Sequence, residues 1–82
     1  MKKTVTGTRT KLEPVYWKLA ARIRMLRQIL DVSQEQLAER AKVSRPTIAN
    51  IEAARQRMSL HQVELIAAAL GTHPRGLMKG MW

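Results

Sequence analysis

Cysteine and phenylalanine are both missing from this chain of 82 residues. Without cysteine, disulfide bonds and thiolate metal sites are excluded. The two histidines, His61 and His73, are too few to hold a metal ion without other ligands. The composition therefore predicts a protein with no bound metal and no other cofactor.

Aromatic side chains are scarce as well, since Tyr16, Trp17 and Trp82 are the only ones. Proteins that bind RNA or single strands usually stack bases on aromatic rings, so this scarcity disfavours both ligands. No apolar run approaches the roughly 20 residues that a membrane span needs. The first residues also lack the apolar core of a signal peptide. We therefore expect a cytoplasmic protein, which agrees with the lack of cysteine.

Acidic residues are few, with six Asp and Glu against fifteen Lys and Arg, and the net charge is +9. The positive charges of so basic a chain repel one another unless the protein binds a polyanion, and nucleic acid is the usual polyanion. The alternatives are a solvated basic surface or a protein that binds membrane surfaces. Because aromatic platforms are scarce, the charge favours duplex DNA as the partner.

The sequence offers little that could support catalysis. It contains no evident pair of carboxylates for a pocket, no nucleophile beside a base and no glycine-rich phosphate loop. We therefore expect a binding protein and not an enzyme.

The chain is short enough for one domain at most. Residues 1–11 show no apolar period and are predicted to be a flexible basic arm. Residues 12–82 have apolar positions at helical spacing and no strand pattern. They predict a compact, all-α domain of five helices. The expected helices are 14–30, 33–42, 44–53, 59–70 and a short one that opens at His73-Pro74.

Capping residues indicate where the helices begin and end. Two capping boxes, Ser33-x-x-Gln36 and Ser59-x-x-Gln62, predict the start of the second and fourth helices. Ser44 begins the third helix. Because Pro46 in the first turn has no N–H, the Ser44 hydroxyl should accept the N–H of Thr47. Gly71 suits the left-handed position that ends the fourth helix.

The stretch from Gln34 to Asn50, QEQLAERAKVSRPTIAN, joins two short helices by a tight turn. Leu37 and Ile48 are apolar where the two helices would pack together, and Ala38 is small where they would cross. A steep crossing with a short turn is the geometry that places the second helix in a DNA major groove. We therefore predict a helix-turn-helix unit at about residues 33–53.

Cap, core and turn residues together resemble the XRE family of helix-turn-helix proteins, to which phage lambda repressor and Cro belong. The resemblance spans about residues 18–79 and implies a lambda-repressor-like fold. It is carried by SQEQLA (33–38), VSRPTIANIE (43–52), Ser59-Leu60 and Leu70-Gly71. The sequence departs from the family at Lys42, where the turn usually has glycine, and at Ala53-Ala54, where glycine often follows the third helix.

The resemblance implies that the exposed side of the third helix reads DNA. Residues expected to face base edges are Ser44, Arg45, Pro46 and Asn50. Arginine can bond guanine and asparagine can bond adenine, whereas proline offers only apolar contact. Residues expected to bind phosphates are Gln34, Thr47, Arg55, Gln56 and Arg57. A plainer alternative stays open for them, because Ser44 can be a cap alone and the others ordinary surface residues.

Two further groups of residues are expected to have structural roles, one within the domain and one between two copies. The family often pairs an arginine of the first helix with the glutamate that ends the third, which implies an ion pair between Arg27 and Glu52. Apolar residues also cluster in the last part of the chain and predict a dimer interface. They are Leu77, Met78, Met81 and Trp82, and the alternative is that they close the core.

The function that follows is a sequence-specific, double-stranded DNA-binding transcriptional regulator. We expect a repressor that binds a palindromic operator as a homodimer. The alternative is an antitoxin that binds a toxin protein and represses its own operon, as small members of the family also do.

Overall fold

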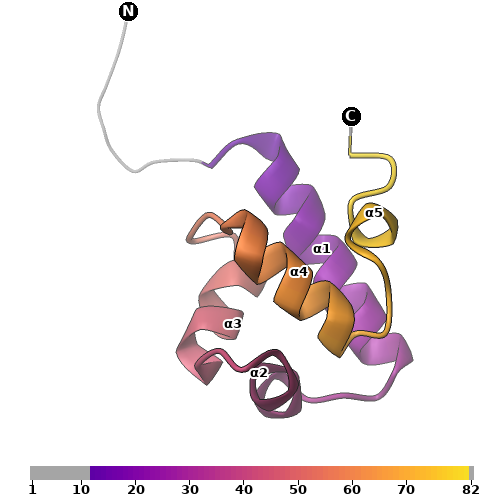
Figure 1. Ribbon diagram of the computed structural model, residues 1–82. Helices are drawn as coiled ribbons and strands as arrows, with labels where there is room; N and C mark the ends of the chain where they lie inside the picture. The colour runs from indigo at the N-terminus through magenta and orange to yellow at the C-terminus, as the bar shows by residue number, and fades with distance from the viewer. Residues whose placement is uncertain (1–11, 82) are drawn as a thin grey trace, which may run out of the picture.

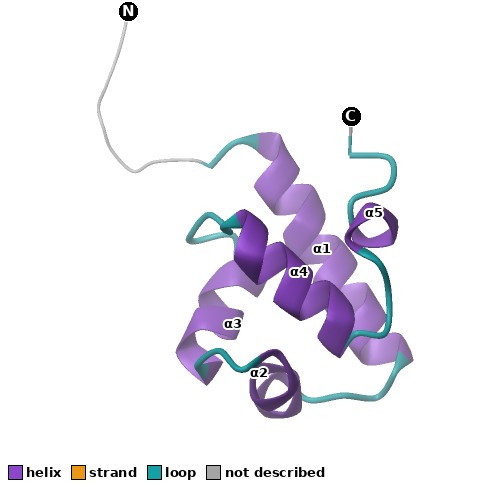
Figure 2. Cartoon of the chain, in the orientation of Figure 1, coloured by secondary structure: helices purple, strands orange, loops and turns teal. Residues whose placement is uncertain are grey.

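The computed structural model describes residues 12–81, and these residues form five helices and no strand (Figure 1, Figure 2). The predicted all-α, five-helix fold is therefore confirmed. The proposed arm, residues 1–11, and Trp82 lie outside the described residues. The helices are α1 (Pro14–Ile29), α2 (Gln34–Ala41), α3 (Arg45–Glu52), α4 (Leu60–Ala69) and α5 (Pro74–Leu77).

Serine caps begin the three central helices, as the sequence predicts. Ser33 and Ser59 each form a complete capping box, in which the serine hydroxyl accepts a backbone N–H and the following glutamine amide accepts the serine N–H. At α3 the hydroxyl of Ser44 accepts the N–H of Thr47, with Oγ and N 3.2 Å apart. This bond goes to the third residue of the helix, as at Ser33 and Ser59, and Pro46 at the second position has no N–H to offer.

Four helices end in the same left-handed motif, although only one of them uses glycine for it. After α4, Gly71 has φ +72° and the N–H of Thr72 donates to the carbonyl of Ala67. The equivalent left-handed residues after α1, α2 and α3 are Asp31, Lys42 and Ala54, at φ 57°, 59° and 57°. A residue with a Cβ in this conformation costs about 1–2 kcal/mol, so the two departures from the family pattern carry strain.

Every helix contributes one large, fully buried side chain to a common core. These side chains are Ile23, Leu37, Ile48, Ile66 and Leu77. Burial of each stabilises the fold by about 1.5–3 kcal/mol relative to exposure. Among residues 12–81, no helix has the length and apolar character to cross a membrane.

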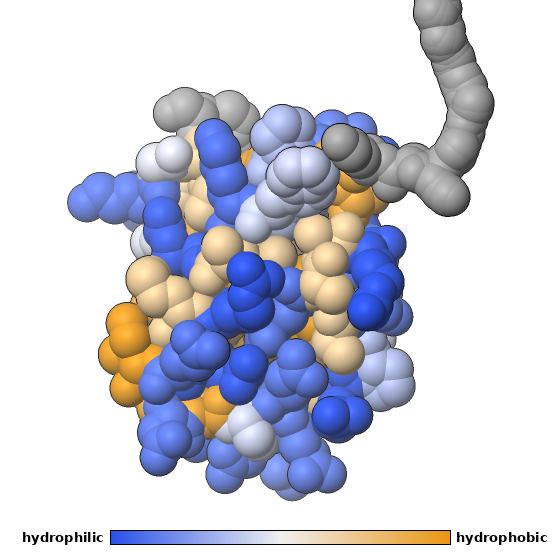
Figure 3. Space-filling model, turned by 180° about the vertical axis from the view of Figure 1, so that it is seen from behind, coloured by the Kyte–Doolittle hydropathy of each residue, from blue (hydrophilic) through white to orange (hydrophobic). Residues whose placement is uncertain are grey.

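The helices are arranged so that α2 and α3 lie together at one end of the molecule (Figure 1). Helix α4 packs against α2 and α5, and α1 packs against α3 and α5. Seen from behind, hydrophilic side chains cover much of the surface, with apolar ones between them (Figure 3). On the outer side of α1 the large exposed apolar residues include Trp17, Met25 and Ile29.

The C-terminal residues pack onto α1 instead of forming one exposed apolar patch. Among the described residues of this group, Leu77 is fully buried and Met81 is 5% exposed, so both close the core, whereas Met78 is half-exposed. Arg22 holds this segment from α1 by donating to the carbonyls of Gly76, Leu77 and Lys79. The expectation that Leu77 and Met81 form an exposed interface is therefore corrected, because their side chains fill the space beside α1.

Candidate nucleic-acid interface

The outer side of α3 carries a short row of accessible side chains. Arg45 and Pro46 are exposed, and Ala49 and Asn50 are half-buried one turn further on. The spacing of four residues places Arg45 above Ala49 and Pro46 above Asn50 on one side of the helix. Ala49 was not among the residues expected from the sequence, although its distance of four residues from Arg45 could have indicated it.

The opposite side of α3 is buried in the core. Ile48 is fully buried and Ile51 is 2% exposed. These two side chains fix the rotation of the helix about its axis. The accessible row therefore has a set direction relative to the rest of the domain.

Ser44 is both the cap of α3 and an exposed residue at its first turn. Its Oγ lies 2.7 Å from the hydroxyl of Thr47, and the two hydroxyls share a hydrogen bond. Both side chains are thus oriented by the helix start. Thr47 is half-buried beside the accessible row.

A buried carboxylate joins α1, α2 and α3 behind this surface. Glu52, 2% exposed, accepts two hydrogen bonds from Arg27, whose Nε and Nη2 lie 2.8 and 3.0 Å from the carboxylate oxygens. Arg27 also donates to the backbone carbonyl of Val32 at 2.9 Å. The pair implied by the family resemblance is present in the structure, and it fixes the end of α3 against α1.

Gln34 is a third partner of this carboxylate, which sequence analysis did not foresee. Its side-chain Nε2 donates to Glu52 Oε1 at 3.1 Å. An amide nitrogen carries two hydrogens, so one remains for another acceptor. Gln34 is also the first residue of α2, where the N–H groups of the first turn have no helical partner.

Arg24 is a further basic residue at the same place, and no sequence signal distinguished it from the other charges of α1. It donates to the backbone carbonyl of Glu52, at the C-terminal end of α3. An open hollow of about 400 Å³ lies beside it. Its lining is Arg24, Arg27, Gln34, Ala49, Glu52, Ala53 and Arg55. The hollow is rich in hydrogen-bond donors and can accept an anionic group.

The loop between α3 and α4 presents the remaining predicted phosphate ligands. Arg55 is exposed, and its Nη1 lies 3.4 Å from Oδ1 of Asn50. Gln56 is half-buried. Arg57 is exposed but already has an anionic partner, because its guanidinium forms an ion pair with Glu13. This pair joins residues 44 positions apart, and the sequence alone gave no sign of it.

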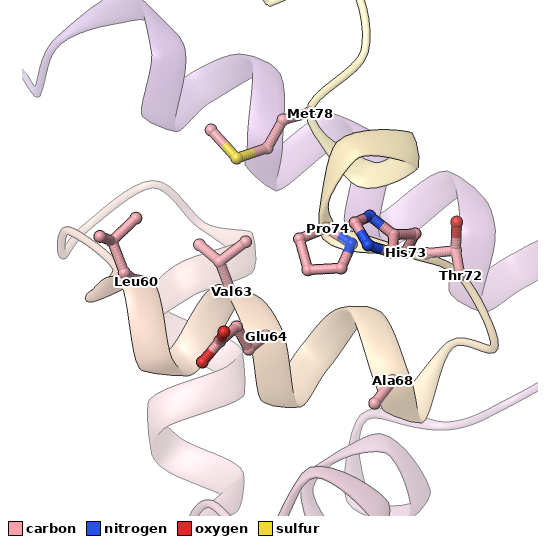
Figure 4. A pocket seen from close by; sticks show the side chains of 8 residues that line it. All are labelled: Leu60, Val63, Glu64, Ala68, Thr72, His73, Pro74 and Met78. Carbon is pink, nitrogen blue, oxygen red and sulfur yellow. The ribbon is translucent and has the colours of Figure 1, made fainter.

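A second, chemically different surface lies between α4 and α5, where a hollow of about 770 Å³ opens. Figure 4 shows Leu60 and Val63 on one side and Met78 pointing toward them from the other. Leu60, at the rim, is 80% exposed. The lining also includes Glu64, Ala68, Thr72, His73 and Pro74.

Neither surface gathers metal ligands. Within the described part of the chain, no three His, Asp or Glu side chains lie close enough to hold a metal ion. His73 accepts the N–H of Arg75 through Nδ1 and thereby caps α5. The Nδ1 atom of His61 lies 3.7 Å from Oε1 of Glu64 on the exposed side of α4.

The helix-turn-helix domain family matches residues 18–78 of this chain. None of the curated proteins matches it. The matched range begins within α1 and extends past α5, so it includes the outer side of α3 and the linings of both hollows.

Solved structures share the fold. The restriction-modification controller protein C.AhdI from Aeromonas hydrophila is 32% identical, over 76% of this chain and 94% of that protein, with a TM-score of 0.73. The clp gene regulator ClgR from Corynebacterium glutamicum is 25% identical, over 77% of this chain and 67% of that one, also at 0.73. The controller protein C.Esp1396I was solved as a tetramer with its natural 35 base-pair operator. It is 21% identical, over 85% of this chain and 92% of that one, with a TM-score of 0.79. At that identity the likeness supports the fold alone.

Proposed function

Because this chain belongs to the XRE-like helix-turn-helix family, we propose that it is a transcriptional regulator that binds double-stranded DNA by sequence. The observation that carries the proposal is the accessible row on α3, whose direction is set by buried residues on the opposite side. The net charge of +9 suits a polyanionic partner. The family is one of DNA-binding regulators and gives no reason to expect catalysis.

Base recognition is assigned to the accessible row. Arg45 is placed to bond guanine O6 and N7, and Asn50 is placed to bond adenine N6 and N7. Pro46 and Ala49 offer apolar contacts, for which a thymine methyl is the matching group. Ser44 contributes mainly by capping the helix, with its exposed hydroxyl at the edge of the row.

Phosphate binding is assigned to residues on both sides of α3. Gln34 has a free amide hydrogen and the N–H groups of a helix N-terminus, which favour an anion. Thr47 contributes at the start of α3, and Arg55, Gln56 and Arg57 contribute from the loop after it. We add Arg24, because it lines the donor-rich hollow at the C-terminal end of α3.

We further propose that the protein acts in the cytoplasm as a homodimeric repressor on a palindromic operator. Two symmetric copies would place their α3 helices in successive major grooves, about 34 Å apart. Residues 12–82 form the DNA-binding domain in this proposal, and residues 1–11 are a basic extension of it.

The surface best suited to a second copy is the hollow between α4 and α5. A two-fold interface must be complementary to itself. Leu60, 80% exposed, projects at the rim of an apolar-lined hollow, so each copy can insert its Leu60 into the hollow of the other. Among the four residues expected at the interface, Met78 lines this hollow, whereas Leu77 and Met81 are buried in the core.

Selection of bound sequences from a random duplex pool tests the proposal as a whole. We expect an enriched palindrome with half-sites about one helical turn apart. If roughly six phosphates are neutralised, affinity for the selected duplex should fall about a thousandfold between 50 and 200 mM salt. No enrichment, or binding that does not respond to salt, would contradict DNA recognition. An enriched sequence without internal symmetry would contradict the homodimer but not DNA binding.

A further inference from the structure

Arg57 and Glu13 form an exposed ion pair at the edge of the proposed DNA interface. The Arg57 Nε lies 2.9 Å from Glu13 Oε1, and its Nη2 lies 3.0 Å from Oε2. The two side chains are 58% and 56% exposed. The pair links the residue before α1 to the loop after α3. That loop and α3 lie along the same edge of the molecule in Figure 1.

Tyr16 gives the arginine a second contact. The central carbon of the Arg57 guanidinium lies 5.9 Å from the centre of the Tyr16 ring, within the range of a cation–π interaction. Tyr16 follows Glu13 by one helical turn, so both contacts come from the start of α1. The guanidinium is thus held in one place by a carboxylate on its edge and a ring beside it.

The carboxylate is ionised under ordinary conditions. The hydrogen bond from Arg57 lowers the pKa of Glu13 below its usual value. The same contact raises the pKa of Arg57, which stays charged. Glu13 occupies the Nε and Nη2 edge of the guanidinium with two oxygens. Two oxygens of a DNA phosphate would bind that same edge in the same way.

We propose that Glu13 is an internal phosphate mimic, which holds the DNA-binding edge of Arg57 in the free protein and gives it up to a DNA phosphate on binding. This inference rests on the proposed function. An exposed ion pair contributes little to stability, so a phosphate can replace the carboxylate. Tyr16 keeps its contact with the guanidinium during the exchange. Glu13 is then left without its partner beside a polyanion, and it lowers the affinity for every DNA sequence.

The substitution Glu13→Gln tests this directly, because the amide keeps the size of the side chain and removes its charge. Affinity should be measured by fluorescence anisotropy on two duplexes of equal length, one selected and one of unrelated sequence. We expect a gain of about two- to fivefold, the range of an exposed ion pair. The gain should be similar on both duplexes, because phosphate contacts carry no base information. A loss of affinity would mean that Glu13 only orients Arg57, and it would overturn the proposal.

A double-mutant cycle separates this contact from a general effect of charge. In the Arg57→Ala background, the gain from Glu13→Gln should fall to that of a general change in charge, since there is no guanidinium left to release. Glu39→Gln is the matched control, because Glu39 is exposed and the substitution makes the same change in net charge without altering the pair. A gain that is undiminished without Arg57, or an equal gain from Glu39→Gln, would overturn the proposal. Failure of the unchanged protein to bind either duplex would instead overturn the proposed function.

Discussion

The outer side of α3 and the hollow between α4 and α5 are both accessible, but they are built in opposite ways. The α3 surface is small and polar, and its direction depends on a buried ion pair and two buried isoleucines. The α4–α5 surface is apolar and concave, with an exposed leucine at its rim. The first suits a polyanion read by hydrogen bonds, and the second suits a protein surface that excludes water. The comparison predicts that damage to one surface spares the other.

The largest effect is expected behind the α3 surface, at Glu52. Replacement by alanine leaves Arg27 partly buried without its partner and removes the acceptor of Gln34. We expect Glu52→Ala to lower the free energy of unfolding by about 3–5 kcal/mol, measured by urea denaturation. Glu39→Ala is the control, because Glu39 is exposed on α2 and should change stability by at most about 0.5 kcal/mol. Equal stability of the two variants would refute the structural role of the ion pair.

The next largest effect is expected at the other surface. Leu60→Glu would place a charge in the proposed dimer interface, and we expect the dimer to weaken by about 2 kcal/mol or more. Sedimentation equilibrium measures this, with the helix content checked by circular dichroism. Ile29→Glu is the matched control, since Ile29 is 69% exposed on α1, away from the hollow. If Ile29→Glu dissociates the dimer and Leu60→Glu does not, the interface lies on α1.

An intermediate effect is expected for base recognition. Arg45→Ala should weaken binding to the selected duplex by about 1–3 kcal/mol and relax the preference at one base pair. Arg55→Ala should instead weaken binding to all sequences. It should also reduce the slope of log affinity against log salt concentration by about one, which corresponds to one phosphate contact. Anisotropy titrations at several salt concentrations distinguish the two patterns. Identical patterns for both variants would contradict the assignment of Arg45 to base contacts and Arg55 to phosphate contacts.

The smallest effect is expected where helices end. Lys42→Gly and Ala54→Gly each relieve a left-handed residue, and we expect a gain of about 0.5–1 kcal/mol in unfolding free energy. Thermal denaturation measures this gain. Neither surface should change its binding, apart from the loss of one positive charge at Lys42. A lower melting temperature for Ala54→Gly would show that the strain at this position is offset elsewhere.

Local patterns in the sequence predicted most of the fold. The caps at Ser33, Ser44 and Ser59 are formed by residues three positions apart, so their hydrogen bonds can be inferred from spacing. The left-handed end at Gly71 has an equally local cause. The pair of Arg27 with Glu52 needed the family resemblance, because no local rule joins residues 25 positions apart.

The contacts that sequence analysis missed are distant in the chain. Glu13 and Arg57 meet because the start of α1 lies beside the loop after α3, and nothing in either segment indicates this. Gln34 looked like a phosphate ligand, yet the fold also brings its amide to Glu52. Leu77 and Met81 were ambiguous, because apolar residues in a very short helix and just after it can serve a core or an interface equally well.

Because α3 separates its accessible residues from its buried ones, we expect that its proposed DNA recognition can be changed without rebuilding the domain. Arg45, Pro46, Ala49 and Asn50 can be replaced together, while Ile48, Ile51 and Glu52 are kept. The exposed side of the helix can therefore vary while its buried side keeps the helix in place. A library with four varied positions would sample new operator preferences on one stable scaffold.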